Sequence, residues 1–219
     1  MARTARAPEC SGTRKSGTTM PEAMVTFDFE PSFALEADPE FPDDGDWGCP
    51  SYGFGRDGRV ADDFDSRWGT PAIYRIKTAE GRSWVGMFAA GGLGQLRAAF
   101  ACPSPTLLCV LADGLAYLVD VESPASGAVI AHDQVGQVVG STTPPLLLLV
   151  RFIDIVAVGP HGIAWKSPRL CVDDLVVRKV TVDAIACTGD NLGGAPEILV
   201  DPATGEWLGG SRLPSGWPA

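Results

Sequence analysis

Only two histidines are available for acid–base chemistry in this 219-residue chain, His132 and His161. A hydrolase triad would place one of them beside a nucleophile, and the sequence has no Gly-x-Ser-x-Gly elbow to supply a serine. His161 lies in a Pro-His-Gly turn, which favours a histidine on a surface loop, while Cys171 is a nearby thiol that could act as a nucleophile. A cysteine-based hydrolase is therefore a secondary hypothesis.

Carboxylates occur in two dense runs, Pro-Asp-Asp-Gly-Asp at 42–46 and Asp-Asp-Phe-Asp at 62–65. Such runs could coordinate Ca²⁺, but neither follows the twelve-residue calcium loop with its closing glutamate. Another pair, Asp173 and Asp174, could work in glycoside hydrolysis only if a turn intervenes, because adjacent strand residues point to opposite faces. We interpret this pair as a turn between strands and the two runs as solvated loops.

The six cysteines form no Cys-x-x-Cys pair, and their scattered positions do not provide the close ligand pairs of a zinc site. Cys109 and Cys187 lie in apolar runs, where a free thiol behaves as a small hydrophobic side chain. The sequence therefore predicts neither a metal nor a cofactor.

The net charge of −10 is concentrated in one segment. Residues 36–65 hold ten acidic residues and two arginines, whereas residues 66–219 are almost balanced. This distribution argues against nucleic-acid binding, which requires clustered Lys and Arg. Residues 1–24 lack the apolar stretch of a signal peptide, and the longest apolar run, 146–150, is too short to cross a bilayer. We expect a cytoplasmic protein with reduced thiols and no membrane partner.

The elements that must position these residues are short strands separated by turns, because β-branched, aliphatic and aromatic runs alternate with breaks such as Asp113-Gly114. Beyond a first strand at 25–29, strands are predicted near 71–77, 82–88, 106–112, 115–121, 127–131, 135–139, 146–153, 155–158, 162–166, 175–182, 184–187, 197–200 and 206–208. Only 93–101 indicates a short helix. The predicted fold class is all-β with antiparallel sheets.

Three turns share a glycine followed by a small residue and an aromatic, at Gly81–Trp84, Gly114–Tyr117 and Gly162–Trp165. The second and third also share the preceding strand pattern at an offset of 48 residues, the length of a sheet of about four strands. In these features, residues 71–210 resemble the repeats of bacterial β-propeller proteins. The resemblance implies an incomplete propeller closed by a partner, with a β-sandwich of repeating hairpins as the alternative. The aromatics Tyr117 and Trp165 are predicted to be buried strand anchors.

Two parts of the chain depart from this pattern. Residues 1–23 have no hydrophobic period and are predicted to be a disordered basic tail, so that residues 24–219 form a single all-β domain. Residues 36–69 are predicted to be a long acidic loop, because they carry six aromatics, more than a purely disordered linker would hold.

A nearly neutral β core beside an acidic, aromatic-bearing segment favours a non-catalytic interaction module with a basic protein partner, such as an adaptor or an immunity protein. Acidic residues would steer this partner and aromatic residues would anchor it. The alternatives are a hydrolase or carbohydrate-binding protein that uses His161, Asp173 and Asp174 on a propeller or sandwich face, and a structural subunit that forms a homo-oligomer. The predicted partner contacts are Asp43, Asp44, Asp46, Trp47, Tyr52, Phe54, Asp62, Asp63 and Trp68.

Overall fold

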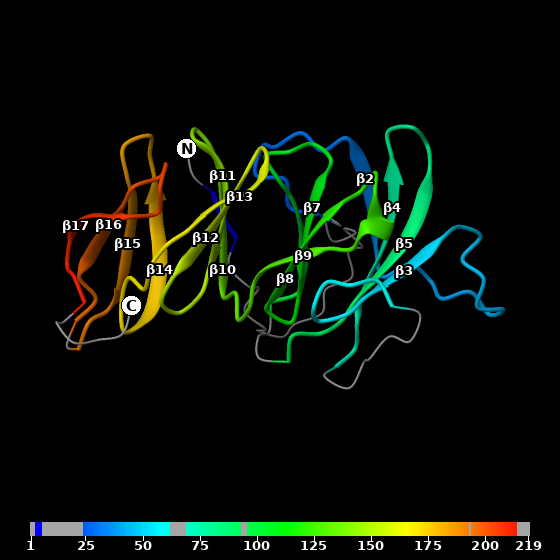
Figure 1. Cartoon of the computed structure of the whole chain (residues 1–219), viewed down its shortest axis with the longest axis horizontal. Helices are drawn as coiled ribbons and strands as arrows, with labels where there is room; N and C mark the ends of the chain where they lie inside the picture. The colour runs from blue at the N-terminus through cyan, green and yellow to red at the C-terminus, as the bar shows by residue number, and fades with distance from the viewer. Residues whose placement is uncertain (1–2, 6–23, 62–68, 93–95, 193, 214–219) are drawn as a thin grey trace, which may run out of the picture.

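The computed structural model describes residues 3–5, 24–61, 69–92, 96–192 and 194–213. Within these ranges the chain forms seventeen β-strands in four sheets, one short 3-10 turn at Pro124–Ser126 and no α-helix. These sheets are packed face to face in an open row, and none of them closes into a barrel (Figure 1). The all-β prediction is confirmed, and the arrangement is consistent with a sandwich or an incomplete propeller.

The first sheet has the strand order β2-β4-β5-β3, in which β3 is parallel to β5 and the other pairs are antiparallel. Its strands are β2 (Phe33–Ala37), β3 (Ser51–Phe54), β4 (Ala72–Thr78) and β5 (Ser83–Phe88). The β4–β5 hairpin therefore lies between β2 and β3, which both precede it in the chain. The connection from β2 to β3 forms a loop at the end of the row.

The other three sheets are antiparallel meanders of consecutive strands. The second sheet contains β6 (Ala98–Ala101), β7 (Leu107–Ala112), β8 (Leu115–Asp120) and β9 (Val129–His132). The third contains β10 (Gln137–Thr142), β11 (Pro145–Val150), β12 (Ile155–Gly159) and β13 (Gly162–Lys166), with β1 (Arg3–Ala5) added beside β10. The fourth contains β14 (Asp173–Val180), β15 (Ile185–Asp190), β16 (Glu197–Val200) and β17 (Trp207–Gly210).

Three buried clusters join the four sheets face to face. The side chains of β11 show how: Leu147 and Leu149 face the second sheet, whereas Leu146, Leu148 and Val150 face the fourth. Because successive strand residues point to opposite faces, a strand buried on both faces needs a continuous apolar run. That run is what the sequence provides for β7 and β11.

The segment before β2 differs from its prediction. Val25 makes only an isolated bridge to Phe100, and Phe27 has a positive φ of 52° within a turn, so residues 25–29 do not form a strand. Phe27 stacks on Phe100 with ring centroids 5.8 Å apart and lies against Gly140 of β10, where a Cβ would fall only 2.3 Å from atoms of the phenylalanine. Further along, the Ser32 amide donates to the carbonyl of Pro105. The segment therefore crosses the second and third sheets before it enters the first.

Other predicted boundaries also change. Residues 98–101 form β6, which corrects the short helix predicted at 93–101, and β1 places Arg3–Ala5 in a sheet rather than in the predicted disordered tail. Each of the thirteen strands predicted after residue 71 overlaps an observed strand. The strands β1, β2, β3 and β6 were not predicted.

The sequence repeat has a different structural basis from the one predicted. The turns before Gly81 and Gly114 each join the two central strands of a sheet, β4–β5 and β7–β8, and are 33 residues apart. The turn before Gly162 joins β12 to the edge strand β13, so the 48-residue offset relates positions that are not equivalent. The anchoring role is nevertheless confirmed, because Tyr117 and Trp165 are buried, with 0% and 8% of their surface exposed.

Candidate functional site

The segment 36–69 is not one loop as predicted, because residues Ser51–Phe54 form β3. We call the connection between β2 and β3, residues 38–50, the acidic loop; it projects beyond the first sheet at one end of the row (Figure 1). Backbone hydrogen bonds fix its two ends, from the Asp38 amide to Ile73 and from the Val85 amide to Pro50. The indole of Trp47 lies 5.8 Å from the guanidinium carbon of Arg75, which points outward from β4. This cation–π contact holds the loop against the outer face of the first sheet.

The acidic loop exposes several carboxylates and one aromatic ring to solvent. Asp43, Asp44 and Asp46 are exposed, and the Phe41 side chain, 62% exposed, packs edge-on against Trp47 with ring centroids 5.2 Å apart. Asp44 and Asp46 each accept a hydrogen bond from the backbone amide two residues further on. These carboxylates therefore shape the turn as well as charge its surface.

The structure separates the predicted partner contacts into three groups. Asp43, Asp44, Asp46 and Trp47 lie together on the loop. Tyr52 is half-buried against Trp84, and Phe54 is fully buried and stacked on Phe88 with ring centroids 4.7 Å apart. Phe54 is thus corrected from a surface contact to a core residue, because β3 turns this side chain toward the second sheet. Asp62, Asp63 and Trp68 lie outside the described residues.

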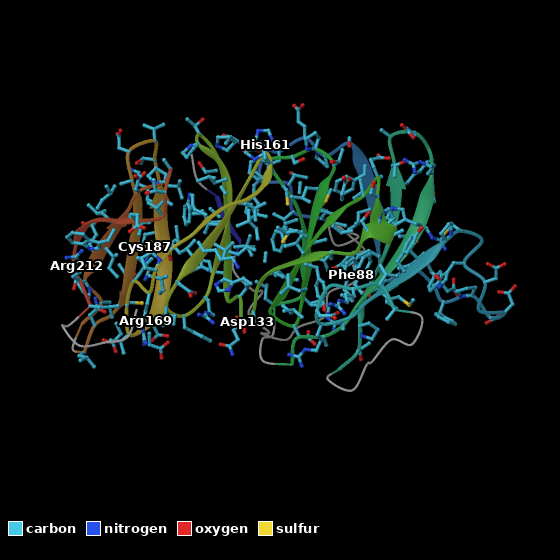
Figure 2. The ribbon with its side chains drawn as sticks, in the orientation of Figure 1. Phe88, Asp133, His161, Arg169, Cys187 and Arg212 are labelled. Carbon is cyan, nitrogen blue, oxygen red and sulfur yellow. The ribbon has the colours of Figure 1, made fainter. Side chains whose placement is uncertain are left out.

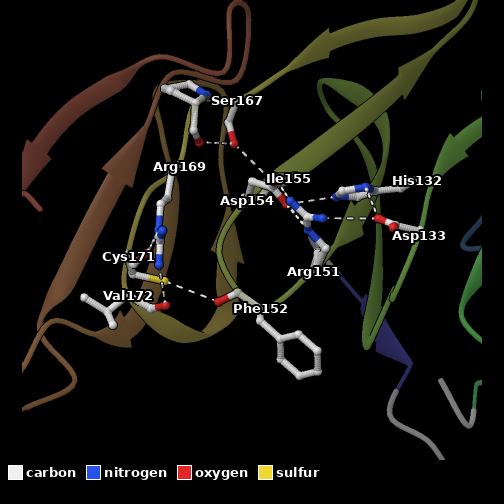
Figure 3. A network of polar contacts seen from close by, with 11 residues as sticks. His132, Asp133, Arg151, Phe152, Asp154, Ile155, Ser167, Arg169, Cys171 and Val172 are labelled. Carbon is white, nitrogen blue, oxygen red and sulfur yellow. Dashed lines mark hydrogen bonds and ion pairs between the residues drawn. The ribbon is translucent and has the colours of Figure 1, made fainter. Parts of the chain in front are cut away.

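A second polar site joins the second and third sheets. The four-residue connection from β11 to β12 holds Arg151 and Asp154, and the guanidinium bonds the carboxylate through Nε at 2.9 Å and Nη2 at 2.7 Å. From β9, the Nε2 atom of His132 lies 2.9 Å from Oδ1 of Asp154 (Figure 3). Asp133 completes the cluster, 3.2 Å from Nη1 of Arg151. We call these four residues the polar junction.

The contacts within the polar junction favour the ionised forms of Asp154 and Arg151. Burial opposes ionisation of Asp154, but hydrogen bonds from His132 and Arg151 outweigh it and hold the pKa of Asp154 below its ordinary value of 3.8. The hydrogen bond to Asp154 likewise raises the pKa of Arg151. The cluster therefore links two sheets through a carboxylate that stays ionised at neutral pH.

The polar junction does not have the geometry of a hydrolase triad. His132 faces Asp154 with Nε2 and Asp133 with Nδ1, the latter at 3.8 Å. Within the described part of the chain, no serine, threonine or cysteine is hydrogen-bonded to His132, so neither ring nitrogen is positioned to activate a nucleophile. The arrangement fits a structural connection between sheets.

The other chemical candidates are separated in space. Figure 2 shows His161 at the opposite end of the sheets from Asp133 and Arg169. Cys171 is buried, donates weakly to the carbonyls of Phe152 and Asp173, and has its pKa raised to about 11 by burial, so it is a thiol at neutral pH. The alternative of a nucleophilic pair formed by His161 and Cys171 is therefore not supported.

The two adjacent aspartates do not form a turn between strands. Asp173 and Asp174 are both exposed and begin β14, where Asp174 has a φ of 54° and the register with β15 shifts. This β-bulge corrects the predicted turn.

Beside His132 lies an open hollow of about 390 Å³, where segments of the first three sheets meet. Its walls come from the β3–β4 connection, the adjacent ends of β8 and β9, and the last residue of β13. The lining residues are Arg56, Leu115, Ile130, Ala131, His132, Asp133 and Lys166.

Comparison with known proteins does not assign this architecture. No family model, no curated protein and no solved structure matches the chain.

The described residues contain no group of three or more His, Cys, Asp or Glu side chains arranged to hold a metal ion. Nor does the described part of the chain contain a helix long and apolar enough to span a membrane. The residues that sequence reasoning missed, Arg151 and Asp154, do have a local signal: they are the charged ends of a four-residue break between two apolar runs.

Proposed function

We propose that this protein is a non-catalytic interaction module that binds a basic protein partner through the acidic loop, residues 38–50. The observation that supports the proposal most directly is the combination on this loop of five exposed acidic residues with the exposed ring of Phe41. The acidic residues are Asp38, Glu40, Asp43, Asp44 and Asp46. Exposed acids accelerate the approach of a basic partner, and a desolvated aromatic ring slows its release. The Trp47–Arg75 contact reduces the freedom that the loop would lose on binding.

Site-specific photocrosslinking tests the proposal. A photoreactive phenylalanine analogue at Phe41 should crosslink a basic protein in extracts of the native host, with Leu208 as the matched position at the opposite end of the row, where 49% of the side chain is exposed. The triple variant with Asp43, Asp44 and Asp46 changed to Asn should lose the product at low salt. Equal crosslinking from both positions, or a product indifferent to the three Asn changes, would refute the acidic loop as the binding surface.

A further inference from the structure

A small pocket of about 190 Å³ lies between the third and fourth sheets. One side of its wall is the start of β10, the end of β11 and the β11–β12 connection, and the other side is the start of β14. The side-chain amide of Gln137 accepts a hydrogen bond from the Val177 amide at 2.9 Å and donates to the Val177 carbonyl at 3.1 Å. The Leu175 amide donates to the carbonyl of Phe152 at 2.9 Å. These bonds fix both sides of the pocket, so a ligand would not have to order them.

The wall holds two charged side chains among the described residues, Arg151 and Asp174. The guanidinium of Arg151 donates to Asp154 through Nε and Nη2 and to Asp133 through Nη1, so two carboxylates share its single charge. Even with His132 protonated, the two cations and two carboxylates of the polar junction sum to zero. Arg151 therefore brings no net positive charge to the pocket.

The charge of Asp174 has no such compensation. Asp174 is exposed, and its carboxylate makes no ion pair or hydrogen bond with any other residue in the described part of the chain. The two cations nearest to it in the sequence lie outside the wall and donate elsewhere, Arg169 to backbone carbonyls and Arg178 to Thr188. A ligand at this wall therefore meets a negative charge.

The rest of the wall is mostly apolar. Val150 and Leu175 are buried, and Val176 is half-buried. Phe152 is 48% exposed, and Figure 3 shows its ring turned away from Cys171. An exposed aromatic face attracts a cation, and a cavity of about 150 Å³ is enough to hold a benzene ring. A carboxylate beside such a surface suits a cationic head on a small apolar body.

We propose that this pocket binds a small organic amine, with its ammonium group beside the Asp174 carboxylate and its apolar body between Phe152 and Leu175. The body that fits is about as large as one aromatic ring. The site lies between the third and fourth sheets, whereas the acidic loop extends from the first sheet, so the site is independent of the protein partner proposed above.

Benzylamine, a cation at neutral pH, is the probe, titrated into the full chain while NMR spectra are recorded. We expect saturable shifts of the backbone amide signals of Phe152, Leu175 and Val176, with a dissociation constant of about 1 mM. Asp174→Asn should weaken binding about ten-fold through loss of one charge-assisted contact. Asn tolerates the left-handed φ of 54° at this position, so the backbone should be retained. Phe152→Leu, which removes the aromatic ring and keeps an apolar side chain, should weaken binding about three-fold.

The controls separate this site from general attraction of cations to an acidic protein. Asp183→Asn, at an exposed turn of the same sheet, and the triple Asn variant of the acidic loop should both leave binding unchanged. Benzyl alcohol, the neutral analogue, should bind at least about ten-fold more weakly than benzylamine. The absence of saturable binding, equal losses from Asp174→Asn and Asp183→Asn, benzyl alcohol binding as tightly as the probe, or shifts confined to the acidic loop would each overturn the proposal.

Discussion

The strands of the two inner sheets are buried on both faces, whereas the strands of the two outer sheets are buried on one face and exposed on the other. In the inner sheets, β7 and β11 are almost continuously buried, because alternate side chains enter different interfaces. In the outer sheets, β4 alternates Ala72, Tyr74 and Ile76 toward the core with Arg75 and Lys77 outward. A continuous apolar run, often a mark of parallel sheets, here indicates an antiparallel sheet covered on both faces.

The polar outward face of the fourth sheet explains why no further sheet in the described part of the chain packs against it. The outward residues of β14 include Arg178 and Lys179, as expected for a terminal sheet that faces solvent. Repeat arrays generally need such polar ends to remain soluble.

The same substitution at two tryptophans should have very different consequences. Trp165 is buried between the third and fourth sheets, and its Nε1 donates to the carbonyl of Pro202 at 2.9 Å, whereas Trp47 is only half-buried in the acidic loop. Trp165→Ala should lower the free energy of unfolding by about 3–5 kcal/mol. Trp47→Ala should cost about 1 kcal/mol or less. Chemical denaturation measures both, and equal losses would contradict the distinction between interface and loop.

Two leucines test the same division within strands. Leu148 is fully buried between the third and fourth sheets, and Leu208 is 49% exposed at the end of the row. Leu148→Ala should destabilise by about 2–5 kcal/mol and Leu208→Ala by no more than about 0.5 kcal/mol. A large loss at Leu208 would show that the outer face of the fourth sheet is not a free surface.

The polar junction should make the contact between the inner sheets sensitive to acid. Because the pKa of Asp154 is lower in the folded state than its ordinary value of 3.8, its stabilising contribution is present above that value and is lost as the pH falls through the folded-state pKa. Asp154→Asn should cost about 1–3 kcal/mol at neutral pH and remove this acid-dependent part of the unfolding curve.

The matched control is Asp183→Asn, at an exposed turn of the fourth sheet. Its stability and its pH profile should follow those of the unmodified protein. The assignment to the polar junction fails if the Asp154→Asn variant retains the full loss of stability between pH values just above and well below 3.8.

The smallest change in the free energy of unfolding is expected when the exposed face of the fourth sheet is made apolar, like the buried faces of the inner sheets. Replacing Arg178 and Lys179 together by Leu should change the free energy of unfolding by no more than about 0.5 kcal/mol, because both side chains are exposed. It should instead cause self-association, since it extends an apolar surface next to Val176. Light scattering at increasing concentration detects the change, and an unmodified protein that already associates through the fourth sheet would contradict the terminal role of these residues.

The sequence predicts the individual strands better than it predicts how the strands pair within sheets and how the sheets pack. Strands such as β7 and β11 are predicted because apolar runs end at clear turn residues. β6 was missed because its Ala-rich run has low strand propensity, and β3 because it is short and contains Gly53. Their places in the sheets depend on contacts with distant strands, which no local pattern specifies.

The sites show the same limit. The acidic loop is evident in the sequence because its charges are adjacent, although burial of Phe54 depends on which way β3 faces. In the polar junction, His132 and Asp154 are 22 positions apart and come from different sheets. Only the packing of the second sheet on the third brings them together.

The segment at 24–33 has a consequence for how the row comes apart. It is held by Phe100 of the second sheet, by Gly140 of the third and, through Phe33, by the first. A row of sheets that meet only their neighbours could open one unit at a time from either end. This crossing segment instead joins three of the sheets into one cooperative unit, and leaves the fourth attached through a single interface. Local opening should therefore begin with β14–β17, at the end of the molecule opposite the acidic loop.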